Sequence, residues 1–277
     1  MARRLLPALA LVLIGQAGPS PTAILTAEYR GAPTARDLSV LRAGVRNGEV
    51  EIQRLAVRAI GRLERPTLIP DLLPPLRSQL PEIRVQAADA IGQAALGWKS
   101  LGPTGRAAGI DSLLQTLVGR LKIERDPAVR RAIDDTLGRL PYSSPGQIAV
   151  AETALTDVAP SETVTDRLGV ATAAASLVRE HYPTWSPTDK LVAELRGFVA
   201  SDPSRDARVR RLALEALATA DLVDDGDITR AARDPDVQVR RLAMDASARR
   251  RSSQAARLKK SHQTATANPP ASPPRTP

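Results

Sequence analysis

The chain of 277 residues contains no cysteine, only six aromatic residues and only two histidines. The absence of cysteine excludes disulfides, thiolate metal sites, cysteine nucleophiles and a lipid-modified cysteine behind a leader. The two histidines, His181 and His262, stand far apart and lack the companions of a zinc site. The run from Asp224 to Asp227 lacks calcium-loop spacing and reads as a turn between helices. No catalytic or phosphate-binding motif is complete. We therefore expect no enzymatic activity, no cofactor and no metal.

Aliphatic residues have to supply the core, because aromatic residues make up 2% of the chain. The hydrophobic content of 43% and the charged content of 25% are typical of chains that fold. Alanine, leucine and valine recur throughout the sequence. An interior rich in alanine indicates helices that pack closely together.

The net charge of +9 is concentrated at the two ends of the chain. Seven basic residues and no acid lie between Arg249 and Pro277, and Arg3 and Arg4 add two more basic residues. The body between these ends is neutral. Because phosphate binding needs clustered lysine and arginine along the contact face, this distribution predicts no specific nucleic-acid partner.

The N-terminus has the pattern of an export signal. A basic segment from Met1 to Arg4 precedes the apolar run Leu5 to Gly15, and small residues follow up to Ala17. The run is shorter than the roughly 20 apolar residues that span a bilayer. We predict a signal peptide over 1–17 and export to the periplasm or cell envelope, with no transmembrane span in the mature chain. An uncleaved anchor and an ordinary N-terminus are the alternatives.

One helical pattern recurs five times along the chain. A β-branched hydrophobe at position 0 is followed by small or apolar residues at +4, +7 and +8, which share one face of a helix. Arginine usually occupies position +1. The copies start at Ile52, Ile83, Val129, Val209 and Val239.

The spacing of the copies predicts a repeat architecture. The starts are 31, 46, 80 and 30 residues apart, and Leu168 to Val178 is the predicted degenerate copy within the interval of 80. A second helix is expected upstream of most copies, so each unit is a helical hairpin. We predict an all-α solenoid of about six hairpins over 36–250, preceded by a linker over 18–35. The upstream helices are expected at Arg36–Arg46, Leu68–Leu76, Ile110–Leu121 and Thr188–Val199.

These copies resemble the HEAT repeat family, including its HEAT-like, PBS-lyase type. Four copies carry an acid three residues before position 0, and Asp126-Pro127 suits the cap and first turn of a helix. The second copy departs, with Leu80-Pro81-Glu82 in that place. The resemblance implies an α-solenoid and leaves function open, since such arrays mostly serve as scaffolds and binding surfaces. The four acids are Glu49, Asp126, Asp206 and Asp236.

The arginines at position +1 have two interpretations. They could form a basic ladder for an anionic ligand, or they could pair with the capping acids of neighbouring repeats. We favour the structural pairing, because the arginines at +2 already have acids four residues later as surface partners. The +1 arginines are Arg84, Arg130, Arg210 and Arg240.

Four of the six aromatic residues fall in predicted connections between repeats. Trp98 lies in a predicted loop over 97–109, Tyr142 follows Pro141, and Tyr182 and Trp185 flank Pro183. Exposed aromatic side chains are common anchors of interfaces, so these four residues are candidates for a rim that binds a protein partner. The alternative is that they cover the ends of helices.

The segment 251–277 is basic and proline-rich, and it is predicted to be a disordered tail. Weak contact with an anionic surface is one possible role, and a solvated end is the other.

The N-terminal region also resembles the repeat region of exported bacterial proteins in which HEAT repeats precede a cyclophilin-type peptidyl-prolyl isomerase domain. The resemblance rests on the export signal, on Ala27 to Arg30, and on Arg62 to Pro70. Nothing in the sequence supplies the isomerase barrel itself. We expect a noncatalytic scaffold that binds protein partners. The alternatives are the repeat region of such an isomerase without its catalytic domain, and a HEAT-like nucleic-acid binder or lyase subunit.

Overall fold

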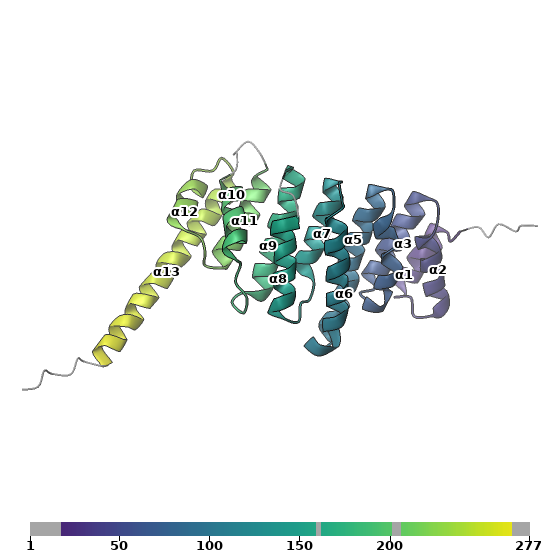
Figure 1. Cartoon of the computed structure of the whole chain (residues 1–277), viewed down its shortest axis with the longest axis horizontal. Helices are drawn as coiled ribbons and strands as arrows, with labels where there is room; N and C mark the ends of the chain where they lie inside the picture. The colour runs from purple at the N-terminus through teal and green to yellow at the C-terminus, as the bar shows by residue number, and fades with distance from the viewer. Residues whose placement is uncertain (1–17, 159–161, 201–205, 268–277) are drawn as a thin grey trace, which may run out of the picture.

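The computed structural model describes residues 18–158, 162–200 and 206–267, so the predicted signal peptide lies outside the described residues. Every regular element in these residues is a helix, and the helices lie side by side along an elongated molecule (Figure 1). The first elements are α1 (Pro21–Tyr29), α2 (Ala35–Val45), α3 (Val50–Arg62), η1 (Pro66–Leu68), α4 (Ile69–Leu72), η2 (Pro75–Arg77), α5 (Pro81–Leu96) and η3 (Gly97–Ser100). They are followed by α6 (Pro103–Leu121), α7 (Pro127–Arg139), α8 (Pro145–Thr153), the π-helical turn η4 (Ala154–Val158), α9 (Val164–His181), α10 (Asp189–Val199), α11 (Ala207–Thr219), α12 (Asp225–Ala231) and α13 (Val237–Ala267).

Six helical hairpins form the array, each made of an A helix and the B helix that follows it. The A helices are α2, α4, α6, α8, α10 and α12, and the B helices are α3, α5, α7, α9, α11 and α13. Each B helix packs against the B helix of the next hairpin, from α3 on α5 through to α11 on α13. This arrangement confirms the prediction of an all-α solenoid of about six hairpins.

The recurring apolar positions form the core between the two rows. Positions 0, +4, +7 and +8 are buried in the four copies that start at Ile52, Ile83, Val129 and Val209. Glycine at +9 lets neighbouring B helices approach closely: a Cβ on Gly138 would lie 2.4 Å from the Cα of Ala173. Each B helix is thus covered by the next repeat, as the spacing predicts.

Acidic side chains cap the N-termini of several B helices. Asp126 accepts hydrogen bonds from the backbone N–H groups of the first turn of α7, and Asp206 caps α11 in the same way. Asp236 accepts two such bonds at the start of α13. Glu49 precedes α3 without a side-chain cap. Three of the four predicted capping acids therefore cap a helix.

The fourth repeat differs from the prediction in its register. Its B helix is α9, and the residue at position 0 is Asp166 rather than Leu168. Val170, Ala173 and Ala174 then occupy +4, +7 and +8, and all three are buried. An acid at a core position explains why the copy looked degenerate in the sequence.

Helices extend past two of the predicted boundaries. The predicted linker over 18–35 contains α1, whose Ile24 and Ala27 are buried against α2 and α3. The predicted disordered tail begins too early, because α13 continues to Ala267 and projects from the array (Figure 1). Residues 268–277 lie outside the described residues. Among the described helices, none is long and apolar enough to cross a membrane.

Candidate functional site

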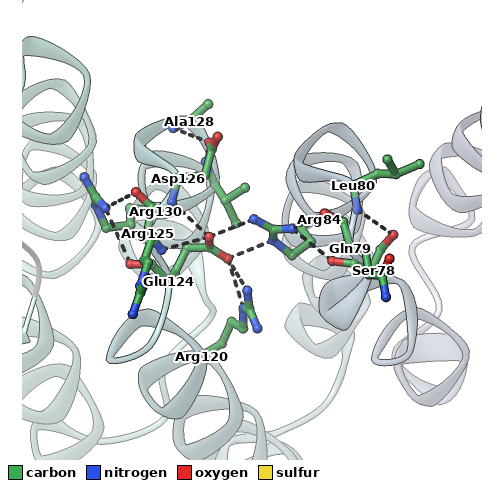
Figure 2. Close-up of polar contacts among 11 residues, drawn as sticks. Ser78, Gln79, Leu80, Arg84, Arg120, Glu124, Arg125, Asp126, Ala128 and Arg130 are labelled. Atoms are coloured by element: carbon green, nitrogen blue, oxygen red, sulfur yellow. Dashed lines mark hydrogen bonds and ion pairs between the residues drawn. The ribbon is translucent and has the colours of Figure 1, made fainter.

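A buried ion pair joins the second repeat to the third. Nε and Nη2 of Arg84 donate to the two carboxylate oxygens of Glu124 at 2.8 and 2.9 Å (Figure 2). Glu124 lies between α6 and α7, and it also accepts the backbone N–H groups of Arg125 and Asp126 at 3.0 Å. The same carboxylate pairs with Arg120. One acid therefore ties the start of α7 to α5.

The same joint recurs twice further along the array. Nε and Nη2 of Arg130 donate to Asp166 at 2.8 and 3.0 Å, and those of Arg210 donate to Asp234 at 2.6 and 3.0 Å. In each case the arginine stands at position +1 and the acid belongs to the next repeat. Three of the four +1 arginines therefore pair with an acid of the neighbouring repeat, although Asp126 and Asp236 are not the acids they use.

The carboxyl pKa of each joint lies below its ordinary value, which favours the ionised pair at neutral pH. Burial alone would raise the pKa of Glu124, but hydrogen bonds from Arg84, Asp126 and Arg120 outweigh it and lower the pKa to about 2. Burial opposes the lowering at Asp166 as well, where Arg130 provides the largest favourable contribution. The carboxylates occupy the guanidinium groups of Arg84, Arg130 and Arg210, so these three are structural and do not form a ladder for an anionic ligand.

The four aromatic candidates do not form one exposed rim. Tyr142 is buried, and its hydroxyl donates to the carbonyl of Leu137 at 2.5 Å. Trp185 is also buried, with 8% of its surface exposed. These two side chains cover helix ends, which corrects the expectation that they are displayed to a partner.

Trp98 and Tyr182 remain at the surface. The predicted loop over 97–109 is absent, because η3 follows α5 directly and α6 begins at Pro103. Trp98 is half-buried, and its indole lies over Gly109 of α6, where a Cβ would approach within 2.6 Å. Tyr182 is 36% exposed. Partner binding by these two aromatic residues stays a prediction.

We call one surface of mixed charge the B-row face and define it by positions +2, +6 and +10 of the six B helices. All of these residues are half-buried or exposed except Leu168. Position +6 is acidic in four repeats and is Arg58 in the first, whereas arginine occupies +2 in four repeats and +10 in three. The acidic members are Asp89, Asp135, Glu215 and Asp245, and the arginines beside them are Arg54, Arg131, Arg211 and Arg241 at +2 and Arg62, Arg139 and Arg249 at +10.

The middle of the B-row face holds two carboxyls with shifted pKa values. Burial raises the pKa of Asp135 to about 6, against the opposing charges of Arg131 and Arg139. Burial also raises the pKa of Asp89, which pairs with Arg139 at 3.4 Å. Perturbed carboxyls on a surface are typical of functional sites, although structural ion pairs produce them too. These side chains make the centre of the B-row face the candidate binding site.

The acidic run and the described histidine that the sequence analysis weighed as metal ligands make other contacts. Asp224 and Asp227 form a capping box that begins α12, as expected for a connection between helices. His181 packs beside the ring of Tyr142, with centroids 5.8 Å apart, and burial lowers its pKa. Within the described ranges, no group of three or more metal-ligating side chains occurs.

Comparisons with known proteins agree on the architecture alone. No protein-family model and no curated protein sequence matches the chain. Two engineered proteins of known structure are similar at 18% and 17% identity, each over 76% of this chain and 94% and 96% of their own, with TM-scores of 0.51. The archaeal HEAT-like repeats protein from Thermococcus onnurineus is similar at 16% identity over 81% of this chain and 90% of its own, with a TM-score of 0.52. The chain therefore has a HEAT-like repeat fold.

Proposed function

We propose that the chain is a noncatalytic scaffold that binds a protein partner on its B-row face. The observation that supports this is the set of four acids at position +6, which lie among arginines at +2 and +10. Because acids and arginines alternate on this face, it fits a protein surface that itself carries both charges. The neutral charge of the body between the two basic ends of the chain disfavours the nucleic-acid-binding alternative.

Site-specific photo-crosslinking in living cells tests the proposal. A benzophenone amino acid at Gln93 or Thr172 lies on the B-row face, and the same residue at Val150 on α8 is a matched control on the other row. We expect a discrete adduct from the two B-row positions and none from Val150. Equal adducts from all three positions, or none from any of them, would refute binding on this face.

Export to the periplasm or cell envelope remains part of the proposal, supported by the basic and apolar segments before Ala17. N-terminal sequencing of the protein isolated from cells is expected to begin at Gly18. A mature protein that still begins at Met1 would contradict cleavage. Localisation of the uncleaved form would then decide between an anchor and a cytoplasmic protein.

The relation to exported isomerases stays a prediction. The N-terminal resemblance described above supports it. The described residues contain no strand, so they do not form the barrel that such an enzyme needs. Reading the coding DNA beyond residue 277 tests it directly. A cyclophilin-like continuation would assign this chain to the repeat region of such an enzyme.

A further inference from the structure

Position +5 of the B helices faces the next repeat in the array. It is fully buried in the first five B helices, from α3 to α11. In α13 the same position is Met244, which is 65% exposed, and Val237 nearby is 60% exposed. The surface that every other B helix buries against a neighbour is thus open on α13. The five buried residues are Val57, Ala88, Asp134, Ala171 and Leu214.

The arginine at position +1 of α13 is held as it is in the occupied joints. In Arg84, Arg130 and Arg240 alike, Nη1 donates to the backbone carbonyls five and six residues earlier, at 2.6 to 3.4 Å. These bonds fix the direction of the guanidinium group. In Arg84 and Arg130 the remaining Nε and Nη2 then donate hydrogen bonds to a carboxylate of the next repeat.

Arg240 has no such carboxylate among the described residues. Its Nη1 contacts go to the carbonyls of Asp234 and Pro235, and none of the described acids forms an ion pair with it. Because Nη1 of Arg240 is held as in Arg84 and Arg130, we infer that Nε and Nη2 face the open side of α13, as they face the next repeat in those two joints. A guanidinium oriented in this way matches the two oxygens of a carboxylate.

We propose that this open face of α12 and α13 binds a helix of another protein, through a carboxylate in the helix's first turn that pairs with Arg240. The proposal goes beyond the proposed function, because it places a second binding site outside the B-row face. The model for the partner is α9, whose Asp166 occupies the third helical position and accepts hydrogen bonds from Arg130. Gly169 of α9 lies against position +5 of α7, and a small residue there would leave room for Met244.

A second copy of this chain is a poorer occupant than another protein. Glu124 and Asp234 stand five residues before position 0 of their repeats, and the corresponding residue of the first repeat is Asn47. The side-chain oxygen of Asn47 is already used, because it accepts the N–H of Glu49 at 2.7 Å. In addition, α1 covers that end of the array. Head-to-tail stacking therefore offers Arg240 no carboxylate at this position.

Position +9 of α13 keeps the small side chain that close helix packing requires. The residue there is Ala248, and the same position is glycine or alanine in the other B helices. In those helices it is buried or half-buried, whereas Ala248 is exposed. A small side chain lets the backbone of a neighbouring helix approach closely. The partner helix can therefore lie along α13 from Arg240 past Met244 to Ala248.

Fluorescence anisotropy with a labelled, helix-stapled peptide of residues 162–181 tests this site on the full chain. We expect saturable binding, weakened at least ~10-fold by Arg240→Gln in the protein and by Asp166→Asn in the peptide. The two changes together should weaken binding no further than either alone. Met244→Glu should also abolish binding, and it alters an exposed side chain, so the fold stays intact. Arg36→Gln changes an exposed arginine at the other end of the array, so it is the matched control and should bind like the wild type.

Absence of saturable binding by the wild type, or binding that Arg240→Gln leaves unchanged, would overturn the proposal. Sedimentation of the chain alone provides a further check. A dimer that disappears in Arg240→Gln would show that a second copy, and not another protein, occupies the site. Because Arg240 and Met244 lie outside the B-row face, this site can fail while crosslinks from Gln93 and Thr172 persist, and the reverse also holds.

Discussion

Asp134 is a buried carboxyl whose removal should stabilise the protein at neutral pH. It stands at position +5 of α7, is 1% exposed, and neither carboxylate oxygen has a hydrogen-bond partner among the described residues. A Cβ on Gly169 of α9 would lie 2.8 Å from Oδ2, so the carboxyl fills the space that this glycine leaves. In the other repeats an aliphatic residue occupies the same place.

The pKa of Asp134 sets the direction of the effect. Burial raises its pKa well above 3.8, and the nearby acids Asp135, Asp166 and Glu194 add to this, while Arg130 opposes it. A carboxyl whose pKa is higher in the folded chain contributes stability at low pH, and that stability is lost as pH rises above the unfolded value. The loss is about 1.4 kcal/mol per pH unit for as long as the folded carboxyl stays protonated.

Urea unfolding of the wild type, Asp134→Asn and Asp134→Ala at pH 4 and pH 7 measures this loss. We expect both variants to gain more than ~1.4 kcal/mol relative to the wild type between the two pH values, because neither side chain can ionise. The slope m should not change. Asp245→Asn is the exposed control and should show no such gain. A difference between wild type and variant that is the same at both pH values would refute the reasoning.

Three further predictions concern packing and pairing. Leu217→Asp places a charge at a site that is 1% exposed, so helicity by circular dichroism and the thermal midpoint should both fall; unchanged values would contradict the placement. Arg130→Met should cost ~3–5 kcal/mol in urea unfolding by leaving Asp166 unpaired, and adding Asp166→Leu should recover most of it; a double variant as unstable as the single one would count against the pair. Gly138→Ala brings a Cβ within 2.4 Å of α9 and should cost ~1–3 kcal/mol, whereas Gly119→Ala, which meets nothing within 4 Å, should stabilise slightly. Equal effects of the two alanines would exclude close approach as the cause.

The B helices could be predicted from the sequence because their buried positions repeat within one helix. Local spacing is sufficient to find Ile52, Ile83 or Val209, because the four core positions of one copy all lie within a span of eight residues. The shorter A helices were harder to predict. Prolines break the predicted helix at 68–76 into η1, α4 and η2, and α8 and α12 contain only nine and seven residues.

The features that the sequence did not reveal depend on contacts between distant residues. Asp166 looks wrong for a core position until Arg130, 36 residues earlier, is seen to pair with it. Tyr142 and Trp185 follow helix ends in the sequence, and only the packing of neighbouring helices buries them. The proline at the start of α6 was a usable signal, because proline favours the first helical turn and so argued against a loop at Trp98.

The three arginine–carboxylate joints give the array a direction. The cation always belongs to the earlier repeat and the acid to the later one, so the two ends of the array differ in chemistry. A symmetric pair of molecules that met through their α13 faces would bring two Arg240 side chains together, and like charges would oppose it. A helix that extends the array at α13 must therefore differ from α13 and supply a carboxylate to Arg240.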